Sequence, residues 1–383
     1  MAHRSVFVYS PDCLAYRFHP DHPFDQRRLF LTLDLLQEWG LITPEQIVAP
    51  RMATDEELRL AHEAAYIDAV KRASENPEAQ DAYLAHGIGT EDNPAFPRMH
   101  EAAALAVGGT LLAAEWVMEG KADHAVNLAG GLHHALRGRA SGFCIYNDCA
   151  VAIAWLRRHY GARVLYLDTD AHHGDGVQWA FYDDPDVLTI SVHETGRTLF
   201  PGTGFVHERG DGPGFGYSVN VPLEPFTEDD AWLEAYIAVV ERVARRFRPD
   251  VIVTQNGCDA HVWDPLSHLC ATTRIYAEIP KLAHRLAHEL CDGRLVAVGG
   301  GGYDIWRVVP RAWALLWAEL VDRPFAGNPK LPRAWLERWQ PHSPVPLPEQ
   351  LLDPPDIVPP IPRRSEIDRR NRRTVELALL YAP

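Results

Sequence analysis

The segment RVLYLDTDAHHGDG, residues 163–176, constrains the fold more than any other part of this 383-residue chain. Its apolar run, VLYL, is typical of a buried strand of a parallel sheet, and it ends abruptly in carboxylates and imidazoles. Alternate side chains of a strand share a face, so Asp168, Asp170 and His172 are expected to project to the same side. Open α/β sheets bind their ligands at the carboxyl ends of such strands. The segment therefore predicts a functional site at the end of a central strand.

Three further strand-like runs also end in side chains that can bind a metal or transfer a proton. Because the carboxyl ends of parallel strands meet at one edge of a sheet, we expect these side chains to converge on the first segment. A sheet whose loops only connect strands would not place such residues after four separate strands. The runs and the residues that follow them are HAVNL (124–128) with His133 and His134, VIVTQ (251–255) with Asp259, and RLVAV (294–298) with a tetraglycine and Tyr303.

The rest of the chain alternates helical and strand-like periodicities, which is typical of an α/β fold with a parallel sheet. Segment 81–98 is expected to be a loop, and its length indicates a functional one. The Pro-rich residues 323–383 are interpreted as an extension that wraps a domain of residues 1–322, with a last helix that starts at Ser365 and is capped with Asp368. Further strands are expected at 5–9 and 187–192, and helices at 27–39, 56–72, 101–119, 149–159, 229–247 and 275–290.

Charge and cysteine usage exclude several classes of protein. A formal net charge of −15 argues against nucleic acid or an anionic membrane as the main partner, since both need a basic face. The six cysteines form no C-x-x-C pair and no framework spacing, so reduced thiols are expected. The N-terminal segment MAHRSVFVYSPD lacks the apolar core of a signal peptide, and no apolar stretch is expected to span a membrane. These features predict a soluble, cytoplasmic protein.

The residue types at the strand ends fit a hydrolytic metal site. A zinc site of this kind needs three nitrogen or oxygen ligands and an open position for water. Asp170 and His172 can supply two ligands, and Asp259 is the best candidate for the third.

Hydrolysis also needs a base for the water and a hydrogen-bond donor for the substrate. His133 and His134 can serve as the base if carboxylates orient them, and two carboxylates are available for this, Asp168 and Asp175. Tyr303, presented by the flexible tetraglycine, can donate a hydrogen bond to a carbonyl oxygen as it becomes an oxyanion.

Six motifs, in this order and spacing, resemble the zinc-dependent histone deacetylase superfamily, and their character is most similar to bacterial acetoin-utilisation deacetylases. The motifs are GGLHHA, RASGFCIYND, DTDAHHGDG, LFPGTG, NGCDAH and GGGGY, within residues 4–320. The resemblance implies the arginase/deacetylase fold, a parallel sheet of about eight strands between helical layers. It also implies hydrolysis of acetyl-lysine to lysine and acetate by a metal-activated water. The implied ion is zinc, or iron(II) in its place, held by Asp170, His172 and Asp259.

Carried over position by position, the resemblance implies further roles. His133 and His134 would flank the water, paired with Asp168 and Asp175, and His134 would protonate the leaving amine. Tyr303 would polarise the acetyl carbonyl. The resemblance also implies a narrow substrate channel walled by Gly142, Phe143, Phe200 and Leu266. Asp92 would be a carboxylate at its rim that binds the substrate, and Arg28 would lie near the exit for acetate. Structural potassium is implied at an inner site, Asp168, Asp170, His172, Ser191 and Val192, and at an outer site, Phe181, Asp184, Val187 and Tyr217.

Three positions depart from the pattern of the histone-directed members. Leu132 stands where many eukaryotic members have Trp, and Thr169 stands where they usually have an apolar residue. Neither change removes a functional group. His261, beside Asp259, is unusual and leaves the composition of the rim, or a second metal ion, open.

Several alternatives remain open at this point. The substrate is either an acetylated protein or a small acetylated amine such as an acetylpolyamine. A two-manganese ureohydrolase of the same fold is a third possibility. A catalytically idle acetyl-lysine binding module is a fourth, although a pure binding module needs neither Tyr303 nor the histidine pair. Ordinary structural roles are the remaining alternative: a solvated acidic loop at 168–175, core histidines, core phenylalanines and a solvated Asp92. The sequence indicates no oligomeric state.

Overall fold

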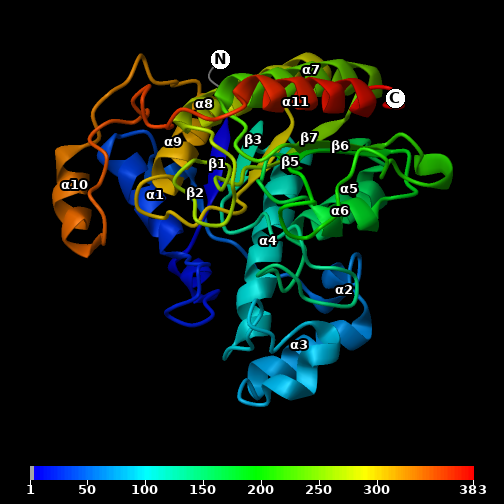
Figure 1. Ribbon diagram of the computed structural model, residues 1–383. Coiled ribbons are helices and arrows are strands. Elements are labelled where there is room, and N and C mark those ends of the chain that lie inside the picture. The colour runs from blue at the N-terminus through cyan, green and yellow to red at the C-terminus, as the bar shows by residue number, and fades with distance from the viewer. Residues whose placement is uncertain (1–3) are drawn as a thin grey trace.

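The computed structural model describes residues 4–383, so the first three residues of the predicted catalytic domain lie outside it. Within the described chain, eight strands form one sheet of order β2-β1-β3-β8-β7-β4-β5-β6, and their pairings are parallel. This confirms the predicted parallel α/β fold (Figure 1). The strands are β1 Ser5–Val8, β2 Ile47–Val48, β3 His124–Asn127, β4 Val164–Asp168, β5 Val187–Glu194, β6 Ser218–Leu223, β7 Val251–Gln255 and β8 Leu295–Val298.

Helices cover both faces of the sheet because the strands are apolar on both faces. In β4, Val164 and Tyr166 pack with α4 and α5, whereas Leu165 and Leu167 pack with α7, α8 and α9. Figure 1 shows α7, α8 and α11 along one side of the sheet and α4, α5 and α6 along the other. The helices are α1 Arg27–Glu38, α2 Asp55–Leu58, α3 Ala64–Glu75, α4 Met99–Met118, α5 Asp148–Tyr160, α6 Asp175–Ala180, α7 Asp229–Phe247, α8 Thr273–Leu290, α9 Val309–Leu320, α10 Arg333–Trp339 and α11 Arg364–Ala378.

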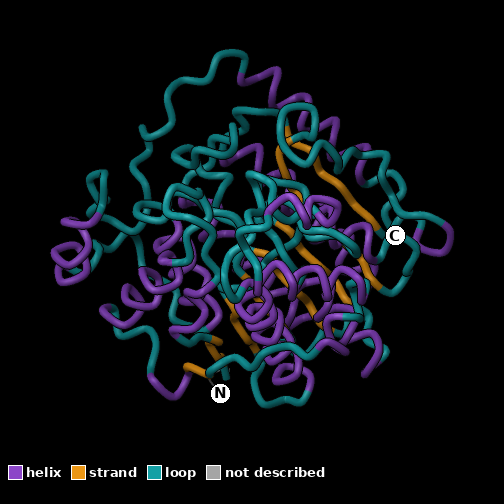
Figure 2. The backbone as a smooth tube through the Cα atoms, turned by 90° about the horizontal axis from the view of Figure 1, so that it is seen from below, coloured by secondary structure: helices purple, strands orange, loops and turns teal. Residues whose placement is uncertain are grey.

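The register of the central strands brings their carboxyl ends to one level. Asp168, the last residue of β4, pairs with Gln255, the last residue of β7. Gln255 and Asn127, which ends β3, both pair with Val298, which ends β8. Figure 2 shows these strands running side by side through the molecule, with loops and helices around them. The loops that leave β3, β8, β7 and β4 therefore start next to one another.

The single helix expected at 56–72 is wrong, because the chain forms two helices there, α2 and α3. It turns between them so that Glu63 N donates to Arg137 O at 2.9 Å and His62 Nδ1 donates to Leu136 O at 3.1 Å. These bonds tie the turn to the loop after β3. Helical periodicity cannot reveal the break, since the partner of His62 lies 74 residues further along the chain.

Other differences lie at the ends or edges of the fold. Segment 81–98 is not all loop, since a 3₁₀ helix at Gln80–His86 occupies its first part. The last helix has Arg363 as its N-cap residue, so Ser365 lies within the helix and does not cap it. The unpredicted strand β6 contains Pro222, which is tolerated because β6 is the edge strand of the sheet.

One helix of the described chain, α4, is long and apolar enough to cross a membrane by length and composition alone. This corrects the expectation that no stretch reaches that length. However, 67% of its apolar window is buried inside the fold, and the helix packs against β3 and α5. A buried core helix passes the same test of length and composition.

The extension after residue 322 lies against the domain along much of its length. Trp335 of α10 is buried, and its Nε1 donates to Leu31 O of α1 at 3.1 Å. Asn371 of α11 is also buried and donates to Thr227 Oγ1 at 2.8 Å. Figure 1 shows α11, in red, lying along α7.

Candidate active site

The side chains of Asp170, His172 and Asp259 converge in the loops that follow β4 and β7, and we call them the Asp-His-Asp cluster. His172 Nδ1 lies 2.8 Å from Asp259 Oδ2 and 3.1 Å from Asp170 Oδ1. One ligand atom of each residue lies within 4.8 Å of the other two, and all three residues are buried. The structure thus brings together the three residues that the sequence predicts as metal ligands.

Backbone and amide groups fix the two carboxylates. Gly301 N and Gln255 Nε2 each donate to Asp170 Oδ2 at 2.7 Å, and Ala171 N donates to Asp259 Oδ1 at 2.7 Å. A Cβ atom at Gly301 would lie only 2.1 Å from Asp259 Oδ2. The tetraglycine after β8 is therefore needed because only a backbone without a side chain can approach the cluster this closely.

The charges of the Asp-His-Asp cluster suit a bound cation. Burial opposes ionisation of Asp170, but the positive charges of His133 and His172 outweigh it and hold the pKa of Asp170 well below its usual value. Burial and the Asp170 charge raise the pKa of Asp259 to about 6. Burial also opposes protonation of His172, but hydrogen bonds to both carboxylates raise its pKa well above the ordinary value. A divalent cation would replace the proton that His172 holds between the two carboxylates.

His133 and His134 follow β3 and lie beside the Asp-His-Asp cluster, each held by its own carboxylate. His133 Nδ1 donates to Asp168 Oδ2, and His134 Nδ1 donates to Asp175 Oδ1, both at 2.7 Å. The two Nε2 atoms lie 3.0 Å apart, and His133 Nε2 lies 3.9 Å from Asp170 Oδ2. The structure therefore brings each histidine to a carboxylate that can fix its tautomer.

The two neighbouring imidazoles differ in their affinity for a proton. Burial disfavours the charged form of His133, but the charges of Asp168 and Asp170 outweigh burial and raise its pKa to about 9. Burial and the positive charge of His133 lower the pKa of His134. A protonated ring and a neutral ring that face each other can pass a proton between them.

Tyr303 is half-buried at the end of the tetraglycine, and several groups position it. Its backbone N donates to Asp264 Oδ2 at 2.8 Å, and its ring packs edge-on against Phe143 with centroids 5.7 Å apart. The buried Arg28 donates from Nη1 to Gly302 O at 3.0 Å. Burial and the nearby carboxylates raise the pKa of Tyr303 well above its usual value, so the phenol keeps its proton and can donate a hydrogen bond.

Three of the predicted channel residues surround these reactive groups. A Cβ atom at Gly142 would lie 2.6 Å from His134 Cδ2 and 2.8 Å from Phe200 Cε1, so the glycine fits between the two rings. The Phe200 ring lies 5.0 Å from the His134 ring and is 42% exposed. Phe143 packs on Tyr303, and its φ of 68° places it in the left-handed region. The two phenylalanines thus flank the histidine and the tyrosine.

Leu266 and Asp92 belong to the loops around these rings. Leu266 N donates to Asp264 Oδ1 at 2.9 Å, which places it in the loop that also positions the tyrosine. Asp92 is exposed, and its backbone O accepts a hydrogen bond from His22 Nε2 at 3.2 Å. The His22 ring packs edge-on against Phe143 with centroids 4.7 Å apart. Asp92 is therefore linked through one ring to an aromatic wall residue.

The residues expected to hold potassium form two groups on adjoining elements. The inner group lies at the carboxyl end of β4 and beside it in β5, where Asp168 pairs with Ser191. The outer group lies where α6 ends and β5 begins, next to the start of β6. Its members are Phe181, Asp184, Val187 and Tyr217, with backbone bonds from Asp184 N to Phe181 O, from Val187 N to Asp184 O and from Thr189 N to Tyr217 O. The assignment of potassium to these groups stays a prediction.

His261 is engaged by the extension and adds no ligand to the Asp-His-Asp cluster. Its Nδ1 accepts a hydrogen bond from Trp263 N at 3.1 Å, and its Nε2 donates to Asp353 Oδ2 at 2.8 Å. Asp353 Oδ1 also lies 2.8 Å from Arg311 Nη2, an ion pair without the alignment of a hydrogen bond. Burial opposes ionisation of Asp353, but these two partners outweigh it and lower its pKa. His261 thus connects the loop after Asp259 to the extension.

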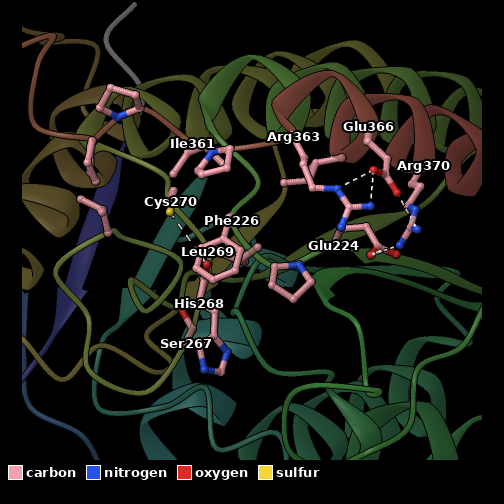
Figure 3. A pocket seen from close by; sticks show the side chains of 16 residues that line it. Glu224, Phe226, Ser267, His268, Leu269, Cys270, Ile361, Arg363, Glu366 and Arg370 are labelled. Carbon is pink, nitrogen blue, oxygen red and sulfur yellow. Dashed lines mark hydrogen bonds and ion pairs between the residues drawn. The ribbon is translucent and has the colours of Figure 1, made fainter.

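A cavity of about 740 Å³ lies between that loop and the extension. Figure 3 shows Phe226 and His268 on the side of the domain, and Arg363 and Glu366 on the side of the extension. None of the reactive residues described above lines this cavity. This cavity is therefore distinct from the candidate active site.

Sequence reasoning missed two residues at the start of α5 that hold the loop of the histidine pair. Asp148 accepts hydrogen bonds from Gly131 N at 3.0 Å and from Leu132 N at 2.8 Å. Asn147 Nδ2 donates to His133 O at 3.0 Å, while its Oδ1 caps the helix. An Asn-Asp pair directly before a predicted helix is a capping signal, and this signal was available in the sequence.

Gln255 and Asp264 were missed as well. Gln255 ends the apolar strand β7 and donates to Asp170, so a polar residue at a strand end was its signal. Asp264 accepts from Tyr303 N, and burial together with the Asp259 charge raises its pKa well above the usual value. No local pattern distinguishes Asp264 from an ordinary loop aspartate.

Comparison with known proteins agrees with this geometry. The family model described as "Histone deacetylase domain" matches residues 22–320. The chain is 58% identical over 375 residues to the acetoin utilization protein AcuC of Bacillus subtilis, covering 98% of this chain and 96% of the relative. It is 47% identical over 370 residues to the protein of the same name from Staphylococcus aureus strain MRSA252, covering 97% and 95%.

Solved structures of histone deacetylase homologues have the same fold as this chain. A crystal structure of a histone deacetylase homologue from Aquifex aeolicus superimposes with a TM-score of 0.85 at 32% identity, covering 98% of this chain and 99% of that one. A crystal structure of a homologue complexed with SAHA gives a TM-score of 0.86 at 33% identity with the same coverage. The expected arginase/deacetylase fold and the expected similarity to acetoin-utilisation deacetylases are confirmed. The chain belongs to the histone deacetylase family and is a hydrolase of the deacetylase type.

Proposed function

We propose that this protein removes acetyl groups from lysine side chains of proteins, releasing lysine and acetate. One observation carries the proposal: three buried candidate ligands, Asp170, His172 and Asp259, lie beside a pair of imidazoles that are each oriented by a carboxylate. This combination suits hydrolysis of an amide by a metal-activated water, because the ligands and the proton-transferring groups are adjacent.

The donor set of the Asp-His-Asp cluster fits zinc, with iron(II) as the alternative ion. Two carboxylate oxygens and one imidazole nitrogen are ligands of the kind found in catalytic zinc sites, which keep a fourth position open. The two negative charges balance a divalent cation inside the fold. When bound, such an ion lowers the pKa of a coordinated water and polarises a carbonyl oxygen.

The surrounding residues of the chain then handle protons and orientation. His134, the ring with the lowered pKa, accepts the proton of the water and returns it to the leaving amine, while the protonated His133 lies beside it and stabilises the negative charge that develops. Asp168 and Asp175 hold the two rings in the tautomer that presents Nε2 to the reaction. Tyr303 keeps its proton, as its raised pKa favours, and donates a hydrogen bond to the acetyl oxygen as negative charge develops there.

The rings and loops around the cluster bind the substrate in this proposal. Gly142, Phe143, Phe200 and Leu266 line a channel for the methylene groups of the lysine, and the exposed Asp92 binds the peptide backbone at the rim. Structural potassium occupies the two groups beside β4 and β5. In this proposal residues 1–322 form the catalytic domain, and residues 323–383 form an extension of it. The protein acts in the cytoplasm, and neither nucleic acid nor a membrane is its partner.

The decisive experiment compares Asp92→Ala on acetyl-lysine peptides and on free acetylated polyamines. If Asp92 holds a peptide backbone, its loss removes a charge-assisted hydrogen bond worth about 1.5–3 kcal/mol, so kcat/KM on peptides should fall roughly ten- to a hundredfold. Activity on the small amines, which have no backbone amides, should change little. Side-by-side kinetics measure both values.

Glu91→Ala is the matched control, because Glu91 is the exposed neighbour of Asp92 and carries the same charge. It should leave both activities close to wild type. Equal losses on both substrates in Asp92→Ala would mean that this residue only shapes the loop. Higher wild-type activity on acetylpolyamines than on peptides would replace the protein substrate with a small amine.

A further inference from the structure

A second group of convergent ligands lies at the opposite end of the sheet from the Asp-His-Asp cluster. It consists of His124, the first residue of β3, and His284 and His288, one turn apart near the end of α8. We call these residues the histidine triad. One nitrogen of each lies within 4.8 Å of the other two, and His124 and His284 are buried while His288 is half-buried.

The three imidazoles meet through their Nε2 atoms. His124 Nε2 and His288 Nε2 lie 3.1 Å apart, and His288 Nε2 and His284 Nε2 lie 3.0 Å apart. The rings cross at 68–88° and are not stacked. Two nitrogens bound to one zinc ion at about 2.0–2.1 Å and at the tetrahedral angle lie about 3.3 Å apart, close to these separations.

The far nitrogens of two of these rings already have the partners that a metal-binding histidine needs. His124 Nδ1 donates to Leu320 O at 2.8 Å, and His284 Nδ1 donates to Glu319 Oε1 at 3.2 Å. Histidines that bind metals donate their other N–H to a carbonyl or carboxylate in this way, which fixes the tautomer. Because Nδ1 carries the proton in both rings, the neutral form of each has its lone pair on Nε2.

Hydrogen bonds alone explain the close contacts within the triad poorly. The single Nε2 of His288 takes part in both contacts, and it can donate at most one hydrogen. A ring nitrogen that carries a hydrogen has no lone pair left to accept another, so His288 Nε2 cannot donate in one contact and accept in the other. A single cation between the three Nε2 atoms satisfies all of them.

We propose that His124, His284 and His288 bind one zinc ion through their Nε2 atoms, at a site separate from the active site. Three imidazoles are a ligand set that suits zinc among divalent ions, with the fourth position filled by water or another donor. The proposal does not depend on the acetyl-lysine substrate, since the triad lies at the amino end of β3 and the active-site loops leave its carboxyl end.

The site joins elements that are far apart in the sequence. His124 belongs to β3, the other two histidines belong to α8, and Leu320 and Glu319, at the end of α9, hold the far nitrogens. A zinc ion would therefore join β3 directly to α8, and the hydrogen bonds of the far nitrogens would connect it to α9. We assign it a structural role, because metal binding to residues assembled only in the folded state stabilises that state.

Metal analysis of the full-length protein tests this proposal. After purification with Zn²⁺ and exhaustive dialysis, the wild type should hold two zinc ions per chain by elemental analysis and His288→Asn should hold one. The variant should keep most of its deacetylase turnover but unfold at a lower temperature. His159→Asn, which removes an exposed histidine from α5, is the control and should hold two ions. Equal zinc contents in wild type and His288→Asn would overturn the proposal.

A second measurement remains informative even if His288→Asn fails to fold. Asp170→Asn disables the Asp-His-Asp cluster and leaves all three triad histidines in place. Co²⁺ added to this variant should bind once per chain, show the intense visible absorption of a four-coordinate site, and be displaced by Zn²⁺. If Asp170→Asn binds no Co²⁺, the triad is no metal site.

Discussion

The Asp-His-Asp cluster and the histidine triad lie at opposite ends of the same sheet. They differ in the charge of their side chains and in the secondary structure that carries them. The first combines two carboxylates with one imidazole, whereas the second has three imidazoles. The first lies in loops, where Gly301 allows the backbone to approach within hydrogen-bonding distance of a carboxylate. The second is built from the start of a strand and the last turns of a helix.

The difference is consistent with the two proposed roles, catalysis at the carboxyl end of the sheet and a structural role at the amino end. Two carboxylates neutralise a divalent cation, so the Asp-His-Asp cluster can hold an ion and still accommodate a substrate and a water beside it. Three neutral imidazoles leave the charge of the ion in place, and Glu319, which faces His284, offsets part of this charge. Loops at the carboxyl ends of the strands also supply the histidine pair and Tyr303, for which the amino end has no counterpart among the residues described above.

The largest effect is expected from Asp170→Asn. Removing one charged ligand should release the catalytic ion and lower turnover by at least roughly 10³, since the water then keeps a pKa close to that of bulk water. Deacetylase assays on an acetyl-lysine peptide measure the loss. Asp183→Asn makes the same change at an exposed aspartate that follows α6, and it should behave as wild type. Substantial turnover in Asp170→Asn would remove this cluster from the mechanism.

Tyr303→Phe should lower turnover by roughly 10²–10³, the usual loss for one oxyanion donor. Unlike Asp170→Asn, this variant should keep the zinc content of the wild type, because the phenol is not a ligand in either site. Kinetics and elemental analysis on the same preparation separate chemistry from metal binding. Tyr160→Phe alters an exposed phenol and serves as control. A kcat near that of wild type would exclude Tyr303 from the reaction.

His62 provides a histidine that belongs to neither site, and it predicts how the metal-free protein responds to acid. Burial lowers its pKa from 6.5 to about 4, because hydrogen bonds with Leu136 O only partly offset the loss of water. A depressed pKa gives stability that is present above pH 6.5 and lost as the pH falls through about 4, and the shift corresponds to about 3 kcal/mol.

Urea unfolding of the chelator-treated protein at several pH values between 7 and 4 checks this expectation. The free energy of unfolding should fall with acid in the wild type and fall less steeply in His62→Gln. The exposed His159→Gln should keep the wild-type slope. Identical slopes in all three proteins would show that His62 does not contribute to acid sensitivity, and acid effects on the holoprotein could then be ascribed to metal release.

The smallest effect concerns the support of the triad. Glu319→Gln removes the charge that faces His284 Nδ1, and the loss of such a supporting partner usually costs about 10–100-fold in metal affinity. Zinc titration in the Asp170→Asn background isolates the triad. Glu289→Gln removes the same charge from an exposed position on α8 and should leave the affinity unchanged. Equal zinc affinities in the two variants would show that Glu319 does not support zinc binding by the triad.

The sequence alone predicts the Asp-His-Asp cluster but not the histidine triad, and the reason is physical. Each residue of the Asp-His-Asp cluster directly follows an apolar run, and parallel strands bring their carboxyl ends together whatever their order. The triad depends instead on how distant elements pack, since His124 and His288 are separated by 164 residues. The spacing of His284 and His288 is visible in the sequence, but it is as compatible with a core helix as with a metal site.

The remaining errors have the same origin. The break between α2 and α3 depends on bonds to Leu136 and Arg137, which local periodicity does not contain. The edge strand β6 has a proline that argues against a strand until its place at the edge is known. Asp264 supports Tyr303 only because two loops meet. Local patterns thus predicted many of the elements and the candidate site residues that the structure brings together, whereas the supporting contacts required the assembled fold.

The contacts of Asp353 with His261 and Arg311 make the stability of the domain depend on the extension. Arg311 is fully buried, and the extension supplies both its counter-charge, Asp353, and a hydrogen-bond acceptor, Leu351 O, at 3.1 Å. A chain cut at residue 322 would remove both of these partners, and breaking a buried ion pair commonly costs about 3–5 kcal/mol. The loop beside Asp259 and the extension therefore depend on each other, and a change in one must be matched in the other.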